Sequence, residues 1–593
     1  MRLANSPETS GRFWEFVSWV TGKRKHSLIP DLVDPKSSAV VSSALAKASL
    51  LNEFFADQTR LDTGSASPDT SSLFPSPDNL TSLHTTPSKV YDVLSHLPVK
   101  KASGLDRITP HLLRACAPGV AVSLASLFNR SFREGVFSSA WKRALVIPAF
   151  KRGDKSNPTN YRPISLLSSV AKVAERIVFD IVYPFISPQL SDRQSGFRKK
   201  DGTSFQLIRL VQQWSEAVDD GCYVGVIFFD LKKAFDKVWH DGLLAKLEML
   251  GVRGVALSWF RNYLTGRSQC TDVAGKTSEF TDLHAGVPQG AILSPLLFIA
   301  YVNDLPQLAP SCDVNLFADD TSASVQAKTA SALSVKLQTA VAECSTWFDK
   351  WFLSINDKKS EFLVVRSRNM KPLSLSLRLN GVDIPLVSVH KHLGVLFNQF
   401  LSWSDHVRYV STGACRKIGL LRRLRTRLGS LVIRQLYCTS IRPAIEYTCL
   451  AWSGLSSQDS AHLEKIQRRA ARLISNMPHT TDMPHNLLLA RAGLQSLRSR
   501  RLIEQAVFAF RFGNGGNSLP RHLVLGLAHW FSSKPAAASR LRNADDFHLP
   551  RPRKNILKSS PLYLSLSFWN SLPPGAKSSK SPRGLRSFLS SYL

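Results

Sequence analysis

The 593-residue chain has few cysteines, no long apolar run and few acidic residues. Its eight cysteines form no C-x-x-C pair and no Cys/His cluster at zinc spacing, which argues against a disulfide framework and a zinc site. We expect them to be small buried residues in a reducing compartment. The longest apolar runs, such as YVGVIFF at 223–229, are too short to span a bilayer, and the N-terminus lacks the form of a signal peptide. These absences predict an intracellular protein, in nucleus or cytoplasm, without membrane segments.

The scarcity of acidic residues gives the chain a strong positive charge. Lys and Arg number 76 against 44 Asp and Glu, a net charge of +32. Residues 401–593 alone hold 30 basic and 8 acidic residues, and most of these cations are Arg, whose planar fork suits phosphate groups. We expect a nucleic-acid partner rather than a membrane surface. A basic face that is merely solvated is the alternative.

The pattern along the chain predicts several domains. Residues 1–60 suggest amphipathic helices (FWEFVSWV, then SSALAKASLLNEFF), and a Ser/Thr/Pro-rich stretch follows at 63–88, so that 1–90 reads as a helical extension and linker. From about 90 to 397, helical patterns alternate with β-rich runs: RALVIPAF (143–150), YVGVIFFD (223–230), VNLFADD (314–320) and EFLVVR (361–366). Beyond 401 helix signals dominate; the tail from 513 has little periodicity. The core is therefore α/β or α+β.

Three carboxylates are candidates for the chemistry. Asp230 ends an apolar run typical of a strand that is buried on both faces, while Asp319 and Asp320 lie at the expected turn of a β-hairpin. Adjacent side chains on a strand point to opposite faces, so the pair converges only where the turn bends the backbone. Mg²⁺ prefers one or two carboxylates, with water and substrate phosphates completing its shell. From spacing alone, Asp residues that merely cap a turn are an equal explanation.

The surrounding motifs resemble the reverse transcriptases of non-LTR, jockey-like retrotransposons over about residues 100–480. The resemblance is carried, in order, by WKRALVIPAFKRGDKSNPTNYRPISLLSSVAKVAERIV (141–178), QSGFRKKDGTSFQL (194–207), FFDLKKAFDKVWH (228–240), HAGVPQGAILSPLLF (284–298), FADDT (317–321), WFLSINDKKSEFLVV (351–365) and HKHLGVLF (390–397). It implies an α+β right-hand polymerase. Its parts would be fingers and an RRM-like antiparallel palm sheet at 131–397 (leading motif from about 95), a helical thumb at 398–480 and a basic C-terminal region at 481–593.

The resemblance also implies roles for individual residues. Asp230 and Asp319 would hold two Mg²⁺ ions, with Mn²⁺ as a substitute, and Asp320 would be a secondary ligand. Phe235 would exclude a ribose 2′-hydroxyl, and Lys359 could protonate the leaving pyrophosphate. The other implied contacts are Lys151 and Arg162 with the triphosphate, Gln289 with nucleotide and template in the turn of Gly286 and Gly290, and Leu393 and Gly394 with the primer end.

Alternatives exist for some of these residues. Phe235 could be an ordinary core residue, and Lys359 could be half of a solvated pair with Lys358. Large aromatic residues at 141, 161 and 351 match the family pattern, but we expect them in the core. The sequence departs from the family pattern at two places: Ser294, where glycine is common, and RKKDGT at 198–203, where the family usually has arginine, serine and threonine. Neither changes a proposed metal ligand.

The expected function is RNA-directed DNA synthesis from element RNA, with template RNA, a DNA primer and deoxynucleotides as partners. Only about 100 residues precede the fingers, too few for the endonuclease of such elements, so we expect any nicking enzyme to act in trans. Scattered acidic residues after 401 argue against an RNase H site. Two alternatives are a silent RNA-binding remnant, against which the three intact carboxylates count, and a group II intron maturase-like protein. Target-primed synthesis is implied by the family alone.

Overall fold

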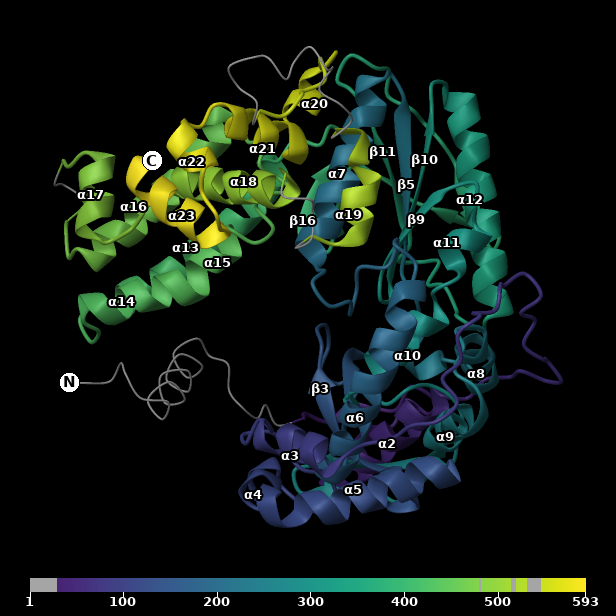
Figure 1. The fold of residues 1–593 in the computed structure, drawn as a ribbon. Helices are drawn as coiled ribbons and strands as arrows, with labels where there is room; N and C mark the ends of the chain where they lie inside the picture. The colour runs from purple at the N-terminus through teal and green to yellow at the C-terminus, as the bar shows by residue number, and fades with distance from the viewer. Residues whose placement is uncertain (1–28, 479–481, 514–518, 531–545) are drawn as a thin grey trace. The chain divides into compact units, whose positions relative to one another are not determined.

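The computed structural model describes residues 29–478, 482–513, 519–530 and 546–593 (Figure 1). The chain forms two compact units that interleave in sequence. The first unit contains Met1–Leu190, Lys232–Asp304 and Phe348–Ser354, and the second contains Ser191–Leu231, Leu305–Trp347 and Ile355–Leu593. The helix expected from FWEFVSWV lies outside the described residues, whereas the second expected helix is α2 (Ala44–Asp57).

The second unit is built on a five-stranded sheet with the order β14-β11-β5-β10-β9. Its strands are β14 (Leu386–Val387), β11 (Glu361–Val365), β5 (Tyr223–Phe229), β10 (Asp320–Ala327) and β9 (Asp313–Phe317). All neighbours are antiparallel except β11 and β14. The predicted strands at 143–150, 223–230 and 361–366 and the hairpin at 314–320 are confirmed.

The central strand β5 is buried along its whole length, as its continuous apolar sequence predicts. In Figure 1 the sheet stands between α7 (Thr203–Asp219) and α12 (Ala330–Lys350). A side chain at Gly225 would lie 2.8 Å from Leu337 of α12, so the glycine lets this helix approach the strand closely. The mixed α+β class expected from the sequence is confirmed.

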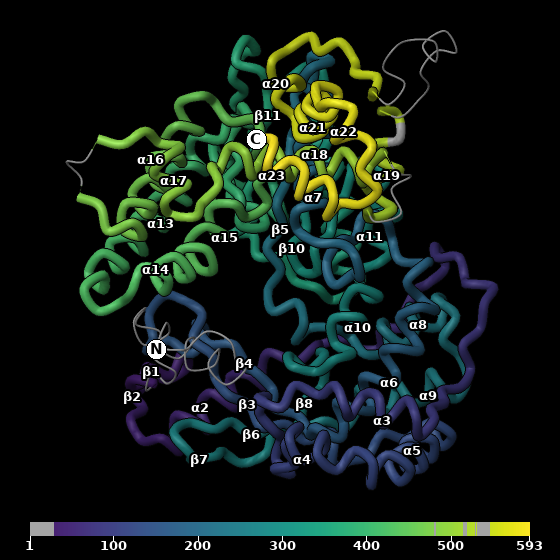
Figure 2. Tube along the Cα trace, turned by 60° about the vertical axis from the view of Figure 1, so that its left-hand side comes forward, coloured from purple at the N-terminus to yellow at the C-terminus, as the bar shows by residue number. Residues whose placement is uncertain are grey.

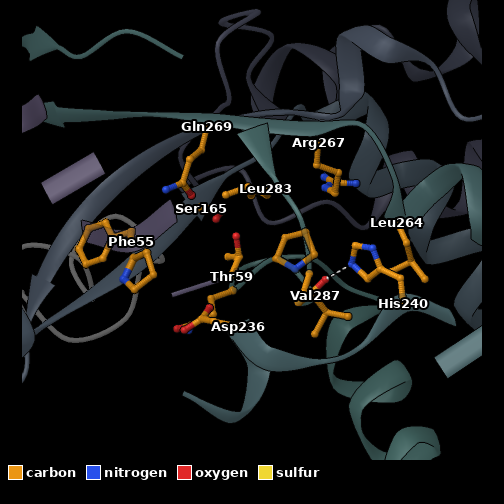
Figure 3. A pocket seen from close by; sticks show the side chains of 15 residues that line it. Phe55, Thr59, Ser165, Asp236, His240, Leu264, Arg267, Gln269, Leu283 and Val287 are labelled. Atoms are coloured by element: carbon orange, nitrogen blue, oxygen red, sulfur yellow. Dashed lines mark hydrogen bonds between the residues drawn. The ribbon is translucent and has the colours of Figure 1, made fainter. Parts of the chain in front are cut away.

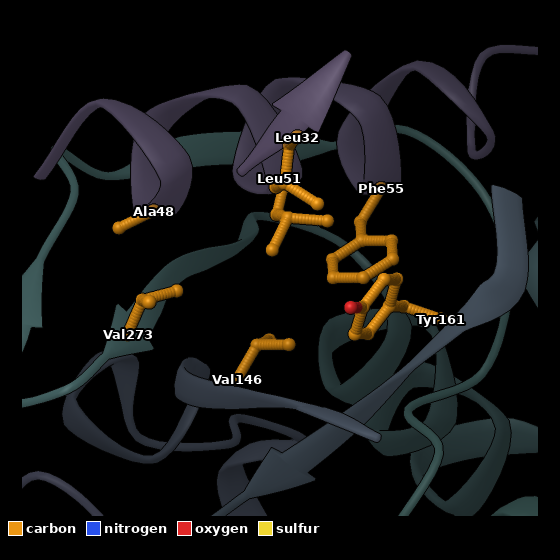
Figure 4. Packing of buried hydrophobic residues seen from close by; sticks show 7 residues of the cluster. All are labelled: Leu32, Ala48, Leu51, Phe55, Val146, Tyr161 and Val273. Atoms are coloured by element: carbon orange, nitrogen blue, oxygen red, sulfur yellow. The ribbon is translucent and has the colours of Figure 1, made fainter. Parts of the chain in front are cut away.

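The first unit contains a second sheet, with the order β4-β3-β6-β7 and β8 beside β6 (Figure 2). Its strands are β4 (Tyr161–Leu166), β3 (Arg143–Phe150), β6 (Arg267–Val273), β7 (Lys276–Thr277) and β8 (Thr281–Leu283). Helix α2 packs against it through the apolar cluster of Figure 4: Leu32, Ala48, Leu51, Phe55, Val146, Tyr161 and Val273. The buried amide of Asn52 donates to the Gln269 carbonyl and to Thr281, which fixes the helix along β6.

Seven further helices of the first unit are labelled in Figure 1. They are α3 (Pro87–Ser95), α4 (Pro110–Ala115), α5 (Ala117–Glu134), α6 (Ser169–Ile186), α8 (His240–Met249), α9 (Gly254–Leu264) and α10 (Ser294–Tyr301). Residues 76–81, within the stretch that reads as a linker, contain no helix, but Ser76 and Leu80 bond the backbone at Met249 and Gly251. Trp141, Tyr161 and Trp351 are buried, as expected.

The second unit continues into a set of helices after the sheet. They are α13 (Ser404–Leu424), α14 (Ser430–Leu436), α15 (Arg442–Ile445), α16 (Ser457–Ile474), α17 (His485–Arg491), α18 (Leu497–Gly513), α19 (Arg521–Gly526), α20 (Asn555–Lys558), α21 (Pro561–Asn570), α22 (Pro574–Lys577) and α23 (Pro582–Tyr592). The helices after 513 are ones that the sequence patterns did not reveal. Within the described residues, no helix is long and apolar enough to cross a membrane.

The described cysteines form no disulfide. Cys270, Cys344 and Cys449 are buried, as expected. Cys116 is exposed and the other four are half-buried, so the prediction of buried cysteines is wrong for these five.

Candidate active site

Strand β5 delivers Asp230 to the end of the central sheet. The seven residues before it are buried, whereas Asp230 itself is exposed, so the carboxylate lies where the buried strand reaches solvent. The register of β10 on β5 pairs Thr321 with Phe229. Continuing that register by one residue places Asp320 opposite Asp230.

Asp319 lies in the two-residue turn of the β9–β10 hairpin. Asp320 pairs with Phe317, so Ala318 and Asp319 form the turn, and both carboxylates are exposed. Ala318 has a φ of 57°, in the left-handed region that tight hairpin turns use. The bend expected from the sequence is therefore present. The register places the three carboxylates at the same end of the neighbouring strands β5 and β10.

Asp230 is held by residues 356–360, in the segment between α12 and β11. The Asn356 side chain donates to Asp230 Oδ2 at 2.8 Å, and the Asn356 backbone N–H donates to the Asp230 carbonyl at 2.6 Å. Ser360 Oγ accepts from the Asp230 N–H at 3.2 Å and donates to the Asn356 carbonyl. Lys359, in the same turn, is exposed, as is Lys358. The sequence analysis missed Asn356 and Ser360, although both lie in the motif that drew attention to Lys359.

The hairpin turn is held by a different segment. The Gln194 side-chain oxygen accepts from the N–H of Gly196 at 2.8 Å and from that of Ala318 at 3.2 Å, and Gln194 is fully buried. These residues come from the QSGF motif, which the sequence analysis used only to support the resemblance. The available signal in the sequence was the glutamine that directly precedes the Ser-Gly pair of this motif.

The carboxylates at this end of the sheet are ligands of the kind that a divalent ion such as Mg²⁺ prefers. Among the residues that the structure describes, no group of three or more His, Cys, Asp or Glu side chains is gathered closely enough to hold a metal alone. Mg²⁺ does not need such a group, because it keeps waters and takes substrate phosphates as ligands beside one or two carboxylates. Exposed carboxylates on a fixed edge meet that requirement.

In the first unit, Gln289 is held by a buried carboxylate. Its side-chain nitrogen donates to both oxygens of Asp236, at 2.9 and 3.0 Å. Burial raises the pKa of the Asp236 carboxyl above its ordinary value, and the Gln289 hydrogen bond opposes that rise. The cavity in Figure 3, which both residues line, has a volume of about 30 Å³. It has room for one or two waters but not for a nucleotide. Asp236 is a residue that the sequence analysis did not single out.

Gly286 and Gly290 bring backbone segments together around Gln289. Both have positive φ, and a side chain would lie 2.8 Å from the Asp236 carbonyl oxygen at Gly286 and 2.4 Å from that of Ser165 at Gly290. The Ser165 N–H donates to the Gln289 carbonyl at 2.9 Å. This turn therefore needs glycine for close approach as well as for conformation.

Phe235 also lies in the first unit, as do Lys151 and Arg162, the two residues expected to bind the triphosphate. The half-buried Phe235 ring stacks on Phe298, with centroids 4.4 Å apart and planes 13° from parallel. Lys151 follows β3, and its backbone N–H bonds the Asn160 carbonyl; Arg162 projects from β4 beside it. Both cations are exposed.

Leu393 and Gly394 form the turn between β15 (Val389–His392) and β16 (Val395–Asn398). Both have positive φ, 45° and 86°, which is typical of a type I′ hairpin turn. Tyr447 packs over the turn: its hydroxyl lies 3.3 Å from the Leu393 carbonyl, and a side chain at Gly394 would lie 3.0 Å from its ring. Strand β15 also reaches the central sheet, because the ring of His390 stacks on Phe228 at 3.7 Å. Tyr447 is a further residue that the sequence analysis missed.

The helical part of the second unit concentrates basic side chains. Helix α16 buries the apolar face predicted from the sequence, including Leu463, Ile466 and Ala470. A cavity of about 710 Å³ lies at its N-terminal half, and α18 contributes to the wall. The charged residues that line the cavity are Glu464, Lys465, Arg468, Arg498 and Arg501, with His485 and several serines. The excess of cations makes it a candidate site for phosphate groups.

Comparison with known proteins identifies the region that holds these motifs. Residues 151–411 match the family model described as "Reverse transcriptase (RNA-dependent DNA polymerase)". The chain is 28% identical to the RNA-directed DNA polymerase from mobile element jockey of Drosophila melanogaster, over 80% of this chain and 52% of that protein. It is also 28% identical to the probable RNA-directed DNA polymerase from transposon BS (66% of this chain, 44% of that protein) and 29% identical to that from transposon X-element (66% and 44%), both of Drosophila melanogaster. The chain thus spans about half the length of these curated relatives.

Proposed function

Because residues 151–411 belong to the reverse transcriptase family, we propose that the chain is the polymerase part of a non-LTR, jockey-like retrotransposon and copies RNA into DNA. The observation that supports this most is the strand register inside the matched region, which places Asp320 opposite Asp230 and Asp319 in the adjoining hairpin turn. The alternative of turn-capping residues does not account for three exposed carboxylates from two separate chain segments.

We assign the parts of a right-hand polymerase as follows. The sheet of the second unit is the palm, the sheet of the first unit belongs to the fingers, and together they occupy 131–397, with a leading motif from about 95. The helices of 398–480 are the thumb, and 481–593 form the basic C-terminal region. Residues 1–90 are the N-terminal extension, of which α2 packs on the sheet that we assign to the fingers.

In this proposal Asp230 and Asp319 hold two Mg²⁺ ions, or Mn²⁺, and Asp320 is a secondary ligand. When bound, such ions neutralise charge on the reacting phosphates and activate the primer hydroxyl. The chain's own contribution is to fix the carboxylates: Asn356 donates a hydrogen bond to Asp230, and Ala318 forms the hairpin turn in which Asp319 lies exposed.

Most of the contacts that we assign to the nucleotide come from residues of the first unit. The exposed cations Lys151 and Arg162 grip the triphosphate, where negative charge is densest. Gln289 is held by Asp236 for contact with nucleotide and template, and the stack of Phe235 on Phe298 holds the ring that excludes a 2′-hydroxyl. Lys359 donates a proton to pyrophosphate, and the Leu393–Gly394 turn supports the primer end.

Template RNA and a DNA primer are the proposed macromolecular partners. The basic helices after 401 supply the attraction, and the cavity between α16 and α18 is where we place strand phosphates. Lys465 and Arg498 are the cations that we select for tests, since both are exposed and line this cavity.

A primer-extension assay tests the proposed function. Purified protein, an RNA template of mixed sequence, a labelled DNA primer and four deoxynucleotides should give a complementary DNA strand only when Mg²⁺ or Mn²⁺ is added. Chelation should stop synthesis, and renewed metal should restore it. RNA binding without any extension, under conditions in which a known reverse transcriptase is active, would instead support the silent RNA-binding remnant.

A further inference from the structure

A short segment at 193–196 runs beside the hairpin that carries Asp319. The Leu316 N–H of β9 donates to the Arg193 carbonyl at 2.9 Å, and the Ser195 N–H donates to the Leu316 carbonyl at 3.0 Å. Gln194 then reaches past the end of β9, and its side chain accepts from the N–H of Ala318. The backbone that precedes Asp319 is therefore bonded to this segment rather than to solvent.

This segment and the turn are packed so closely that there is no room for a side chain between them at Gly196. A side chain at Gly196 would lie 2.5 Å from the Ala318 nitrogen and 2.9 Å from the Phe317 carbonyl carbon. Two backbones in contact cannot move independently, because packed interiors transmit displacement. A shift of residues 194–196 must therefore shift the turn.

The same segment is held on another side by the C-terminal region. His522, the second residue of α19, has only 4% of its surface exposed. Its Nε2 lies 2.7 Å from Asp201 Oδ2 and 3.3 Å from Ser195 Oγ. The Asp201 side chain is 3% exposed, so a hydrogen bond from His522 satisfies a carboxylate that would be costly to bury alone.

Further contacts dock the C-terminal region along α7, which begins directly after this segment. The indole N–H of Trp530 donates to Glu216 at 2.6 Å. The backbone N–H groups of Arg553 and Lys554 donate to Asp219 at 3.0 and 2.5 Å. These bonds join chain segments that are more than 300 residues apart, and α7 packs on β5, which carries Asp230.

We propose that His522 is a positioning residue of the polymerase centre: by donating to Asp201 it fixes residues 194–202, and through Gln194 it fixes the turn that presents Asp319. The inference rests on the proposed function for its catalytic meaning. It gives residues 520–530 a role that the basic composition of the C-terminal region did not suggest, because the contact is made by a buried histidine.

The test compares three variants of the full-length protein. His522→Leu removes the donor and leaves Asp201 unpaired, whereas His522→Gln keeps an N–H near the position of Nε2. Lys577→Met is the control, since it breaks a partly buried ion pair of the C-terminal region, with Asp546 at 2.6 Å. Loss of such a supporting contact typically costs 10- to 100-fold in metal affinity or activity.

We expect His522→Leu to lower kcat for primer extension 10- to 100-fold and to raise the Mg²⁺ concentration at half-maximal rate, with the affinity for RNA–primer duplex changed less than twofold. His522→Gln should recover most of the rate, and Lys577→Met should stay near wild type. A wild-type rate in His522→Leu, or a loss of duplex affinity equal to the loss of kcat, would overturn the proposal.

Hydrogen exchange gives a readout that needs no activity. Backbone amides of residues 316–320 should exchange faster in His522→Leu than in wild type, and not in Lys577→Met. If His522→Leu does not fold, Gln194→Leu tests the other end of the same chain of contacts with the same expected results. Unchanged exchange at the turn contradicts the positioning role, whereas an inactive wild-type protein contradicts the proposed polymerase function instead.

Discussion

Phe235 is the residue whose environment bears most directly on substrate choice. A fully enclosed core phenylalanine would have no exposed edge, whereas this ring is half-buried and stacks on Phe298. Such a stack stabilises the pair of rings by about 1 kcal/mol beyond the effect of burial, and so restricts the motion of Phe235. A stiff ring can reject an added hydroxyl that a mobile one would accommodate.

We predict that Phe235→Ala increases ribonucleotide incorporation relative to deoxynucleotide incorporation by at least tenfold, because the space that a 2′-hydroxyl needs is opened. The measurement is the ratio of kcat/KM for the two nucleotides in wild type and variant. Phe298→Leu, which loosens the stack and leaves Phe235 in place, should give an intermediate ratio. An unchanged ratio in Phe235→Ala would make the residue an ordinary core phenylalanine.

His406 on α13 gives the molecule a predictable response to acid. Burial lowers its pKa to about 4 from an ordinary value of 6.5, with Lys391 adding to the effect, and its Nδ1 accepts from the Leu396 N–H at 3.3 Å. Between pH 6.5 and 4 the unfolded chain gains a proton that the folded chain does not. Stability is therefore full above pH 6.5 and falls as the pH decreases through this window.

We predict that His406 alone removes about 2 kcal/mol of stability between pH 7 and pH 5. The check is the urea midpoint at the two pH values for wild type, His406→Gln and the exposed control His84→Gln. The shift in midpoint should be smaller in His406→Gln and unchanged in the control. An equal shift in all three proteins would show that His406 titrates as it does in the unfolded chain.

At the scale of elements, the sequence predicted strands of both sheets well because its information is local. Period and composition identified RALVIPAF, YVGVIFF and EFLVVR, and the apolar run before Asp230 correctly implied a strand buried on both faces. The face of α16 was also predicted, since it follows a simple helical period.

The elements and contacts that were missed depend on distant parts of the chain. Helices α19 to α23 are short, and α19 and α20 are stabilised by packing and by bonds to α7 rather than by a clear apolar period. Asn356, Gln194 and His522 act through bonds to residues that are up to 327 positions away, so no local pattern marks them. The Cys prediction failed for a related reason, because burial is a property of the fold.

At the scale of the whole molecule, the charge of residues 401–593 should govern affinity for nucleic acid. If six to ten phosphates are contacted, affinity for a duplex should fall about 10³- to 10⁵-fold between 50 and 200 mM salt, and somewhat less for single strands. Truncation is a poor test of this charge, since α19 and α20 pack on α7 and their removal would disturb the sheet. Surface variants avoid that problem.

We predict that Lys465→Gln combined with Arg498→Gln reduces the slope of log affinity against log salt by about 1 to 2 on one RNA, because two phosphate contacts are lost. The matched control, Arg114→Gln with Arg133→Gln, removes the same charge from exposed positions of α4 and α5. It should change the slope by less than half as much. Equal effects would mean that net charge matters and the cavity between α16 and α18 does not.

The most direct measurement of the central claim is single-turnover primer extension by Asp319→Asn at saturating Mg²⁺. Replacing the carboxylate by an amide of the same size removes the charge that holds the metals and preserves the turn. The control is Asp383→Asn, in the hairpin of β12 (Leu377–Leu379) and β13 (Val382–Ile384) of the same unit, where the carboxylate pairs with Arg378 on the surface. We expect Asp319→Asn to lose at least three orders of magnitude in rate while it folds and binds RNA–primer duplex as wild type does, and Asp383→Asn to keep its rate. An Asp319→Asn protein that extends primers within tenfold of wild type would contradict the assignment of this edge as the polymerase centre.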